Sequence, residues 1–449
     1  SKSSLETVFH SLVHPTLQQW IMSILDESEW SACNKLVWGP AEPSPDTLAR
    51  WLQGFQFSED EPTALLQLQG GPCAVVAAIQ AHMIQLAIFK HGCLQPQDFK
   101  GDSTVLLTQA IAAVMQQLAD SNGGCCVLVF QPEELLSEED GSTVISIEEI
   151  RQSLRKSEVP PPVQPDLMEQ MVMSVLQGLL GKLGLLSLVY SAVLTLGVDQ
   201  VRQQVADEEE SLVDPRSGNG SQALLNLLIA GVATPHFFDG MRNVDGLVMQ
   251  GIASQPSIGF LTLLESLRYC EVGWHLKNPR YPVWIVGSET HLTVLFSNEA
   301  GLIQGDGKCQ EVERVFHQLD ASSAGFIPAD KLDELIKSAR LDLPEGCQNL
   351  SELKTRLDPE GLQIILRDSF IRLFFPNACN DYPSKFALFH LNNLARGATA
   401  KVAYVRGDAN MQQEIADCSV GHCDLMRVLQ TKWPTLTVKW EGDRLPSIN

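Results

Sequence analysis

The chain has 449 residues, of which 44% are hydrophobic and 19% are charged, and its formal net charge at pH 7 is −22. These values predict a globular protein with a large core, built as one large enzyme domain or as roughly two to three smaller ones. The negative charge argues against nucleic acid and anionic membrane surfaces as main partners, whereas a neutral or basic protein partner is compatible with it.

The eleven cysteines are odd in number and lack the spacing of a disulfide framework. No secretory signal opens the chain, so we expect free thiols and a location in the cytoplasm or nucleus. Two tight clusters occur, Cys125-Cys126 and Cys418 with His422-Cys423. Neither has a second pair at zinc spacing, and we therefore expect no metal and no cofactor.

Residues 1–30 are expected to form one or two amphipathic helices, because Leu5, Val8 and Leu12 recur near helical spacing. A proline-rich loop follows, and Thr47 is expected to cap the next short helix.

The segment Gln67–Cys73 reads Gln-Leu-Gln-Gly-Gly-Pro-Cys and precedes residues that favour a helix up to Lys90. Gly-Gly-Pro is a break followed by a helix-start signal, which places Cys73 in the first turn. Free backbone N–H groups and the positive end of the helix dipole favour a thiolate there. A lone cysteine is more often a small buried residue, but the flanking glycines and Gln67 favour a nucleophile at Cys73.

Residues 102–120 are predicted to form a helix, and the β-forming residues Cys126–Phe130 a buried strand. The acidic and then proline-rich stretch 132–165 is predicted to be a surface excursion. Ser221 is expected to cap a helix over 222–230, and residues 260–269 are expected to form another helix.

The apolar segment 171–197 is long enough to span a membrane. Lys182 lies near its middle, where a charge is costly in lipid. We therefore expect a buried helix, or two helices broken around Gly181 and Gly184, and no membrane span.

Residues 282–296 give the strongest strand signal and are predicted to form two strands interrupted near Gly287. In the second strand, Glu289 and His291 share one face by the period of two. Residues 302–304 are a candidate for the next strand. Further strands are expected over 361–366, 386–391, 401–405 and 436–440. Helices come early and the sheet late, which predicts an α+β fold.

Residues 311–340 are predicted to form two helices around the loop 320–331. Set against an EF-hand loop, Asp320 fills position one and Gly325 position six, but Lys331 replaces the bidentate glutamate. Too few oxygen ligands remain, so we expect an EF-hand-like shape without calcium.

A cysteine nucleophile needs a base and a donor to the developing oxyanion. Among ten histidines, His291 has the most suitable setting, on a strand after the Cys73 helix. Gln67 lies six residues before Cys73 and is the candidate oxyanion donor, with Gln69 as the competitor. The residue that orients His291 stays open between Glu289 and Asp306.

Sequence blocks across nearly the whole chain from about residue 35 match one family. They are Trp51–Phe55, Gln67–Gln80, Leu212–Pro215, Gly218–Gln222, Gly259–Glu265, Arg268–Cys270, Pro282–Phe296, Leu357–Leu362 and Gln430–Pro434. On these blocks the sequence resembles the MINDY deubiquitinases, and most closely the member with an EF-hand-like insertion.

The resemblance implies a papain-like cysteine protease fold over 35–449, with an EF-hand-like insertion at 311–340. Residues 1–34 match no block of the family, and their helical spacing predicts an N-terminal helical arm. It implies a cysteine isopeptidase that cuts ubiquitin from polyubiquitin, preferring chains linked through lysine forty-eight of ubiquitin. The family's nucleophile, histidine and oxyanion glutamine fall on Cys73, His291 and Gln67. An inactive ubiquitin-binding scaffold and a thiol enzyme acting on another amide, such as a transglutaminase, are the alternatives. The oligomeric state stays open.

Overall fold

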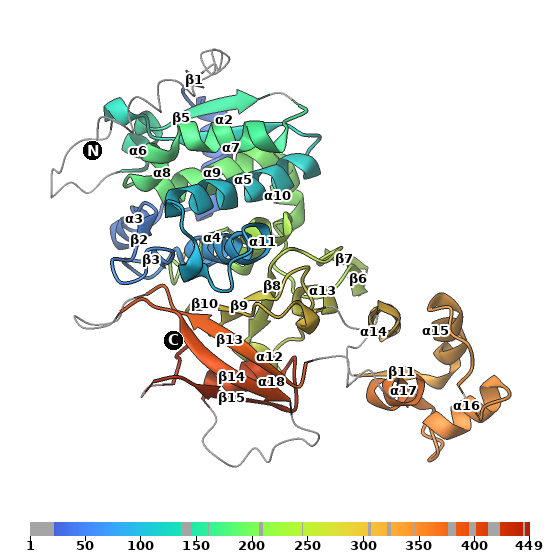
Figure 1. Cartoon of the computed structure of the whole chain (residues 1–449). Coiled ribbons are helices and arrows are strands. Elements are labelled where there is room, and N and C mark those ends of the chain that lie inside the picture. The colour runs from blue at the N-terminus through green and yellow to red at the C-terminus, as the bar shows by residue number, and fades with distance from the viewer. Residues whose placement is uncertain are drawn as a thin grey trace. The chain divides into compact units, whose positions relative to one another are not determined.

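The chain divides into two compact units in the computed structural model (Figure 1). The structure describes residues 22–449 except 136–145, 160, 206–209, 245, 304–306, 321–324, 345, 376–382, 395–400, 412–422 and 443–444. Unit 1 contains the described residues of 1–57, 65–79 and 102–233, and unit 2 those of 58–64, 80–101 and 234–449. The helix α4 (Cys73–Gln85) belongs to unit 1 up to Ile79 and to unit 2 from Gln80.

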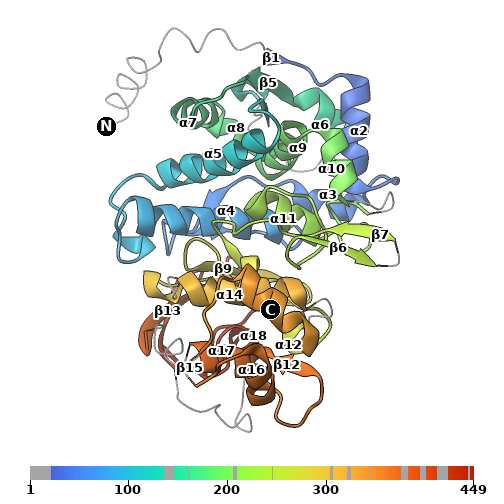
Figure 2. The same cartoon turned by 90° about the vertical axis from the view of Figure 1, so that its right-hand side faces the viewer.

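Unit 1 is mainly helical. Besides the start of α4, its α-helices are α2 (Glu27–Trp38), α3 (Pro45–Trp51), α5 (Ser103–Ser121), α6 (Ile147–Ser153), α7 (Pro165–Ser174), α8 (Leu176–Leu180), α9 (Gly184–Leu196), α10 (Val198–Val205) and α11 (Gln222–Ala230). Its strands are β1 (Met22–Ser23), β2 (Gln56–Phe57), β3 (Leu65–Leu66), β4 (Cys126–Phe130) and β5 (Arg155–Val159), with one sheet in the order β1-β5-β4 and a β2-β3 pair. Helices α5, α7 and α9 lie side by side in both views (Figures 1 and 2).

Several predicted elements of unit 1 are confirmed. Helix α5 begins after Asp102, whose side chain accepts a hydrogen bond from the backbone N–H of Thr104 at 2.9 Å. Strand β4 is fully buried, and Ser221 caps α11. The cap of α3 is Ser44 and not Thr47, because Pro45 occupies the first helical position.

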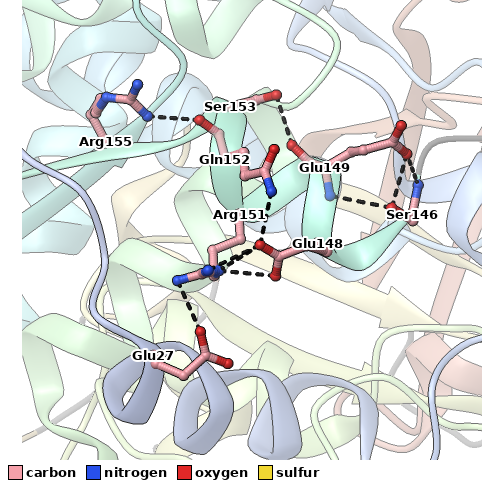
Figure 3. Close-up of polar contacts among 8 residues, drawn as sticks. All are labelled: Glu27, Ser146, Glu148, Glu149, Arg151, Gln152, Ser153 and Arg155. Carbon is pink, nitrogen blue, oxygen red and sulfur yellow. Dashed lines mark hydrogen bonds and ion pairs between the residues drawn. The ribbon is translucent and has the colours of Figure 1, made fainter.

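The predicted surface excursion at 132–165 is wrong in part, because it contains α6 and β5. Strand β5 pairs antiparallel with β4, and Leu128 lies opposite Ser157. Figure 3 shows that Ser146 and Glu149 form a reciprocal capping box at the start of α6. Arg151 forms ion pairs with Glu148 at 2.9 Å and with Glu27 of α2 at 3.1 Å.

The apolar segment 171–197 is broken as expected. Helix α8 ends at Leu180, α9 starts at Gly184, and nearly every side chain of α9 is buried. The next helix, α10, is bent by 93° from α9. Within the described part of the chain, one helical stretch, Cys73–Lys90, is apolar and long enough to cross a membrane, but 89% of it is buried inside the protein. It therefore has the burial of a core helix.

Unit 2 is built around a six-stranded sheet in the order β15-β14-β13-β10-β9-β8. Its strands are β8 (Gly259–Thr262), β9 (Val283–Gly287), β10 (Leu292–Phe296), β13 (Lys385–Leu391), β14 (Val405–Met411) and β15 (Leu436–Trp440), and a separate hairpin joins β6 (Met241–Val244) to β7 (Leu247–Gln250). All neighbouring strands of the sheet are antiparallel except β8 and β9. The short helices α12 (Leu263–Ser266), α13 (Trp274–Lys277) and α18 (Asp424–Gln430) complete this part.

The core of the sheet region contains Trp284 and Trp433, whose rings meet edge to face at 5.2 Å. Strands β9 and β10 confirm the predicted pair interrupted after Gly287. The helix predicted over 260–269 is wrong: β8 occupies its first part, because Phe260 pairs in parallel with Ile285, and only one turn of helix follows. The strand predicted over 302–304 is also wrong at its described residues, since Leu302 ends a 3₁₀ helix and Ile303 lies in a turn, whereas residue 304 lies outside the described residues.

Two helix–loop–helix segments lie together in unit 2. The first joins α14 (Gly307–Leu319) to α15 (Leu332–Ser338), and the second joins α16 (Leu350–Leu357) to α17 (Arg367–Phe374). Their loops pair through two short strands, β11 (Phe326–Pro328) and β12 (Ile364–Leu366), in which Ile327 lies opposite Ile365. Phe316, Phe370 and Leu353 are fully buried in the shared core. The second segment was not predicted as part of a pair.

The described residues of the two loops share one backbone contact. Each begins with an aspartate that accepts a backbone hydrogen bond from the residue five positions later, at 2.7 Å, from Gly325 to Asp320 and from Gln363 to Asp358. Both donors have positive φ, +79° for Gly325 and 59° for Gln363. Each aspartate therefore stabilises a left-handed turn of its own loop.

These two left-handed positions predict opposite effects of substitution. Gly325→Ala should lower the free energy of unfolding by about 1–2 kcal/mol, because a Cβ is strained at this φ. Gln363→Gly should raise it by about 0.5–1 kcal/mol, since relief of the strain exceeds the added chain entropy of glycine. Urea unfolding of both variants measures the changes, and shifts of the same sign would contradict the prediction.

His390 is a buried base in the middle of the sheet. Its Nε2 lies 3.0 Å from Thr293 Oγ1. Burial, and then the nearby His291, lower the pKa of His390 to about 3. An unfolded histidine titrates near pH 6.5, so below that pH the unfolded chain binds a proton that the folded chain does not. Stability should therefore fall as the pH drops from about 6.5 toward 3.

The predicted slope from this one group is up to about 1.4 kcal/mol of unfolding free energy per pH unit. His390→Gln keeps a polar side chain near Thr293 and removes the titration. Urea unfolding between pH 4 and 7 should show a shallower pH dependence for the variant than for the wild type. Equal slopes in the two proteins would contradict the assignment.

Candidate active site

Cys73 is the first residue of α4 and is only 3% exposed. The helix is started by Pro72, whose carbonyl accepts hydrogen bonds from the N–H groups of Val75 at 3.0 Å and Val76 at 3.1 Å. The Cys73 Sγ lies 3.8 Å from the carbonyl oxygen of Gly71. The predicted position of this thiol, at a helix N-terminus after a Gly-Gly-Pro turn, is thus the position that the structure gives it.

Gln67 lies in the same unit as Cys73 and is 2% exposed. Its Nε2 donates a hydrogen bond to the carbonyl of Gln69 at 2.8 Å. The side chain of Gln69, the competing candidate, is exposed. Of the two glutamines, Gln67 is the one whose amide is held inside the protein.

Gln53, two residues after the end of α3, holds the segment before Cys73 in place. Its Oε1 accepts hydrogen bonds from the N–H groups of Leu68 at 3.0 Å and Gln69 at 3.4 Å. Its Nε2 donates to the carbonyl of Arg50. It also donates to the carbonyl of Gln69 at 3.4 Å. A single buried amide thus contacts four backbone groups of two segments, which orders the approach to the thiol.

The turn at 214–220 also contacts the Cys73 segment within unit 1. The N–H of Gly220 donates to the carbonyl of Gly71 at 3.0 Å, and the indole of Trp51 donates to the carbonyl of Gly218 at 2.9 Å. Gly71 has φ +125°, and a Cβ on Gly220 would lie 2.8 Å from that of Ala74. Glycine is therefore required at both positions, for backbone conformation at Gly71 and for close packing at Gly220.

His291 lies in the tight turn between β9 and β10 and is 4% exposed. Ser288 fixes this turn: its Oγ accepts from the N–H of His291 at 3.0 Å, and its N–H donates to the carbonyl of His291 at 2.9 Å. The backbone at the imidazole is therefore held on both sides by one serine.

The imidazole of His291 is oriented by Asn392, which directly follows β13. His291 Nε2 and Asn392 Oδ1 are 2.9 Å apart. Asn392 Oδ1 also accepts from the N–H of Leu394 at 3.0 Å, while Asn392 Nδ2 donates to the carbonyl of Ser447 at 3.3 Å. The Oδ1 atom accepts from a backbone N–H and the Nδ2 atom donates to a backbone carbonyl, so these partners distinguish the amide oxygen from the amide nitrogen. Because Oδ1 can only accept, Nε2 of His291 is the donor, and in the neutral ring the lone pair then lies on Nδ1.

Asn392 was missed in the sequence, where Glu289 and Asp306 were the candidates to orient His291. The side chain of Glu289 is exposed in the turn, and the structure assigns the contact with Nε2 to Asn392. Asp306 lies outside the described residues. The available signal was the placement of Asn392 just after a strand that could neighbour β10, but that pairing was not predictable.

The predicted site residues fall in different units: Cys73 and Gln67 belong to unit 1, and His291 belongs to unit 2 together with Asn392. Each half is ordered by its own hydrogen bonds. In the part of the chain that the structure describes, no group of three or more His, Cys, Asp or Glu side chains could hold a metal ion. Cys73, His291, Gln67 and Asn392 themselves provide a thiol, an imidazole and two amides.

Comparison with known proteins gives the family. A family model described as "Deubiquitinating enzyme MINDY-3/4, conserved domain" matches residues 35–328. The chain is 35% identical to a protein named ubiquitin carboxyl-terminal hydrolase MINDY-3 from Xenopus tropicalis, over 93% of this chain and 100% of that protein. It is also 35% identical to the Homo sapiens protein of the same name, over 92% of this chain and 98% of that protein.

More distant relatives fit the same pattern. The Drosophila melanogaster MINDY-3 homolog is 31% identical over 96% of this chain and 85% of its own length. No solved structure gives a significant match. The match of both the family model and nearly full-length relatives shows that this chain belongs to the MINDY family of deubiquitinating enzymes.

Proposed function

We propose that this protein is a cysteine-dependent deubiquitinase that hydrolyses the isopeptide bond between ubiquitin units, with preference for chains linked through lysine forty-eight. The family supports the reaction class. The observation that carries the mechanism is the pairing of His291 with Asn392 at 2.9 Å, in a family whose reaction needs a base for a thiol. The names of the relatives specify ubiquitin, and the acidic chain suits a basic partner surface.

In this mechanism the Cys73 thiolate attacks the carbonyl of the C-terminal glycine of ubiquitin. His291 accepts the thiol proton on Nδ1 and gives it to the leaving lysine amine. It then accepts a proton from a water molecule, which hydrolyses the thioester and releases ubiquitin from Cys73. Asn392 keeps Nε2 engaged and Nδ1 available, which is the arrangement of papain-like cysteine proteases. A papain-like catalytic domain is therefore part of the proposal.

Gln67 supplies the oxyanion donor in this scheme. Its amide has two N–H donors, and the contact with Gln69 uses one. The second N–H and the backbone N–H of Cys73 are then the donors to the developing negative charge. One such donor typically contributes ~3 kcal/mol to the barrier reduction.

The paired helix–loop–helix segments are proposed to be an EF-hand-like insertion that needs no calcium. Lys331 occupies the last ligand position of the first loop, and the register of β11 and β12 places Ser369 there in the second. Neither loop has the bidentate glutamate of calcium-binding EF-hands. The proposed site of action is the cytoplasm or nucleus, as the free thiols suggest.

The scaffold hypothesis depended on the lack of a residue to orient His291. Since Asn392 contacts the imidazole, that reason no longer applies.

Cleavage of purified polyubiquitin tests the activity directly. The wild type should release ubiquitin, and Cys73→Ala should abolish turnover while leaving the fold intact, because the nucleophile is lost. Chains of different linkage, incubated in parallel, measure the linkage preference. A ubiquitin probe with a C-terminal electrophile should label the wild type at Cys73. Labelling that persists in Cys73→Ala would assign the reaction to another thiol.

The role of Asn392 can be tested through the pH profile. Asn392→Ala should lower kcat by roughly ten- to a hundredfold with little change in KM. This loss is a part of the roughly 10²–10⁴-fold rate enhancement that general acid–base catalysis contributes. Asn392→Asp keeps an acceptor for Nε2 and favours the imidazolium, so it should retain more activity and move the alkaline limb of kcat/KM to higher pH. Wild-type profiles in both variants would show that Asn392 does not position the base.

A further inference from the structure

Gln80 is a fully buried amide on α4 whose polar atoms are all engaged. Its Nε2 donates to the carbonyl of Thr63 at 3.1 Å and to the hydroxyl of Tyr404 at 3.3 Å. Its Oε1 accepts from Nδ2 of Asn393 at 3.2 Å. All four residues belong to unit 2.

The network around Gln80 is held firmly. The Tyr404 hydroxyl donates to the carbonyl of Thr63 at 3.2 Å, and its ring meets Phe296 of β10 edge to face at 5.6 Å. Burial raises the pKa of Tyr404 well above its usual value, so the hydroxyl remains a donor at all physiological pH values. Breaking one of these bonds would leave a buried polar group unsatisfied, which is costly.

Asn393 is the residue after Asn392. One of these two consecutive asparagines contacts the imidazole of His291, and the other contacts Gln80. Asn393 is 1% exposed and lies just beyond the end of β13. The backbone that positions the orienter of the base is thus anchored to α4.

Helix α4 is one continuous helix from Cys73 to Gln85. Gln80 follows Cys73 by seven residues, which is two helical turns on the same face and roughly 10 Å along the axis. A fixed Gln80 therefore limits translation and rotation of the helix that carries the thiol.

We propose that Gln80 and Asn393 are positioning residues that tie the nucleophile helix to the strand end that orients His291. The inference rests on the proposed function. It assigns to the Gln80–Asn393 contact the task of keeping the thiol of Cys73 and the imidazole of His291 in reacting geometry. Neither residue touches the reacting atoms. Their contribution lies in geometry, and a displacement of about 1 Å at the reacting atoms can cost about a hundredfold in rate.

Gln80→Met keeps the length of the side chain and removes its hydrogen bonds, and Asn393→Leu removes the same contact from the other side. Each single variant should lower kcat at least about tenfold, with KM for ubiquitin substrates within twofold of wild type. The double variant should be no slower than the slower single variant, because Gln80→Met already removes the contact that Asn393→Leu removes. Thr195→Val is the matched control: it removes buried hydrogen bonds between α9 and β4 in unit 1, and it should lower the melting temperature but leave kcat unchanged.

The second measurement does not need ubiquitin. Alkylation of Cys73 by iodoacetamide across pH reports the thiolate stabilised by the imidazolium, and Gln80→Met should move its midpoint to higher pH. A folded Gln80→Met with wild-type kcat and alkylation midpoint would overturn the proposal, as would losses in kcat that add in the double variant. If one single variant does not fold, the other removes the same Gln80–Asn393 hydrogen bond, and its kcat and alkylation midpoint test the proposal. If the wild type cleaves no ubiquitin, the proposed function fails, while the alkylation midpoint still tests the contact.

Discussion

The complete burial of helix α4 is the constraint on which the rest of the structure depends. No residue from Cys73 to Gln85 is more than 8% exposed. A helix that is apolar on every face gains stability from burial, but each polar side chain inside it must find a partner. Gln80 meets this condition through Thr63, Tyr404 and Asn393, which lie on segments far from Gln80 in the sequence or far from one another. Satisfying one buried amide thus joins the nucleophile helix to the end of β13.

Much of the fold could be predicted from residue type alone. The pair of strands around Gly287 and the strand Cys126–Phe130 were predictable, because β-branched and apolar residues dominate them. The helix expected at 260–269 was wrong because a run of apolar residues is compatible with both the helical and the strand period. Pairing with the parallel strand β9 makes the first part of this segment a strand. The pairing of the two helix–loop–helix segments was hidden, since Gln363 fills the left-handed position where the sequence signature requires glycine.

The candidate site was predictable to the extent that its chemistry is local. The position of Cys73 follows from Gly-Gly-Pro before a helix. His291 was expected on the strand, and it lies one residue before β10, which begins at Leu292. Asn392 and Asn393 depend on tertiary structure: Asn392 and His291 are 101 residues apart, and their contact follows from the register that sets Val294 opposite Leu391. A pair of asparagines after a strand suggests only a turn in the sequence.

Two neighbours of His291 in unit 2, Asn392 and His390, are neutral, and this has a chemical consequence. Asn392 contributes an amide, and His390 remains uncharged near neutral pH, because burial lowers its pKa to about 3. A charged His390 would repel a protonated His291, as their mutual electrostatic interaction indicates. A neutral His390 removes that repulsion, and an amide orienter adds no negative charge that would hold the proton on the ring. His291 can then gain a proton from the thiol and lose it to the leaving amine. This suits a group that must both accept and release a proton in each turnover.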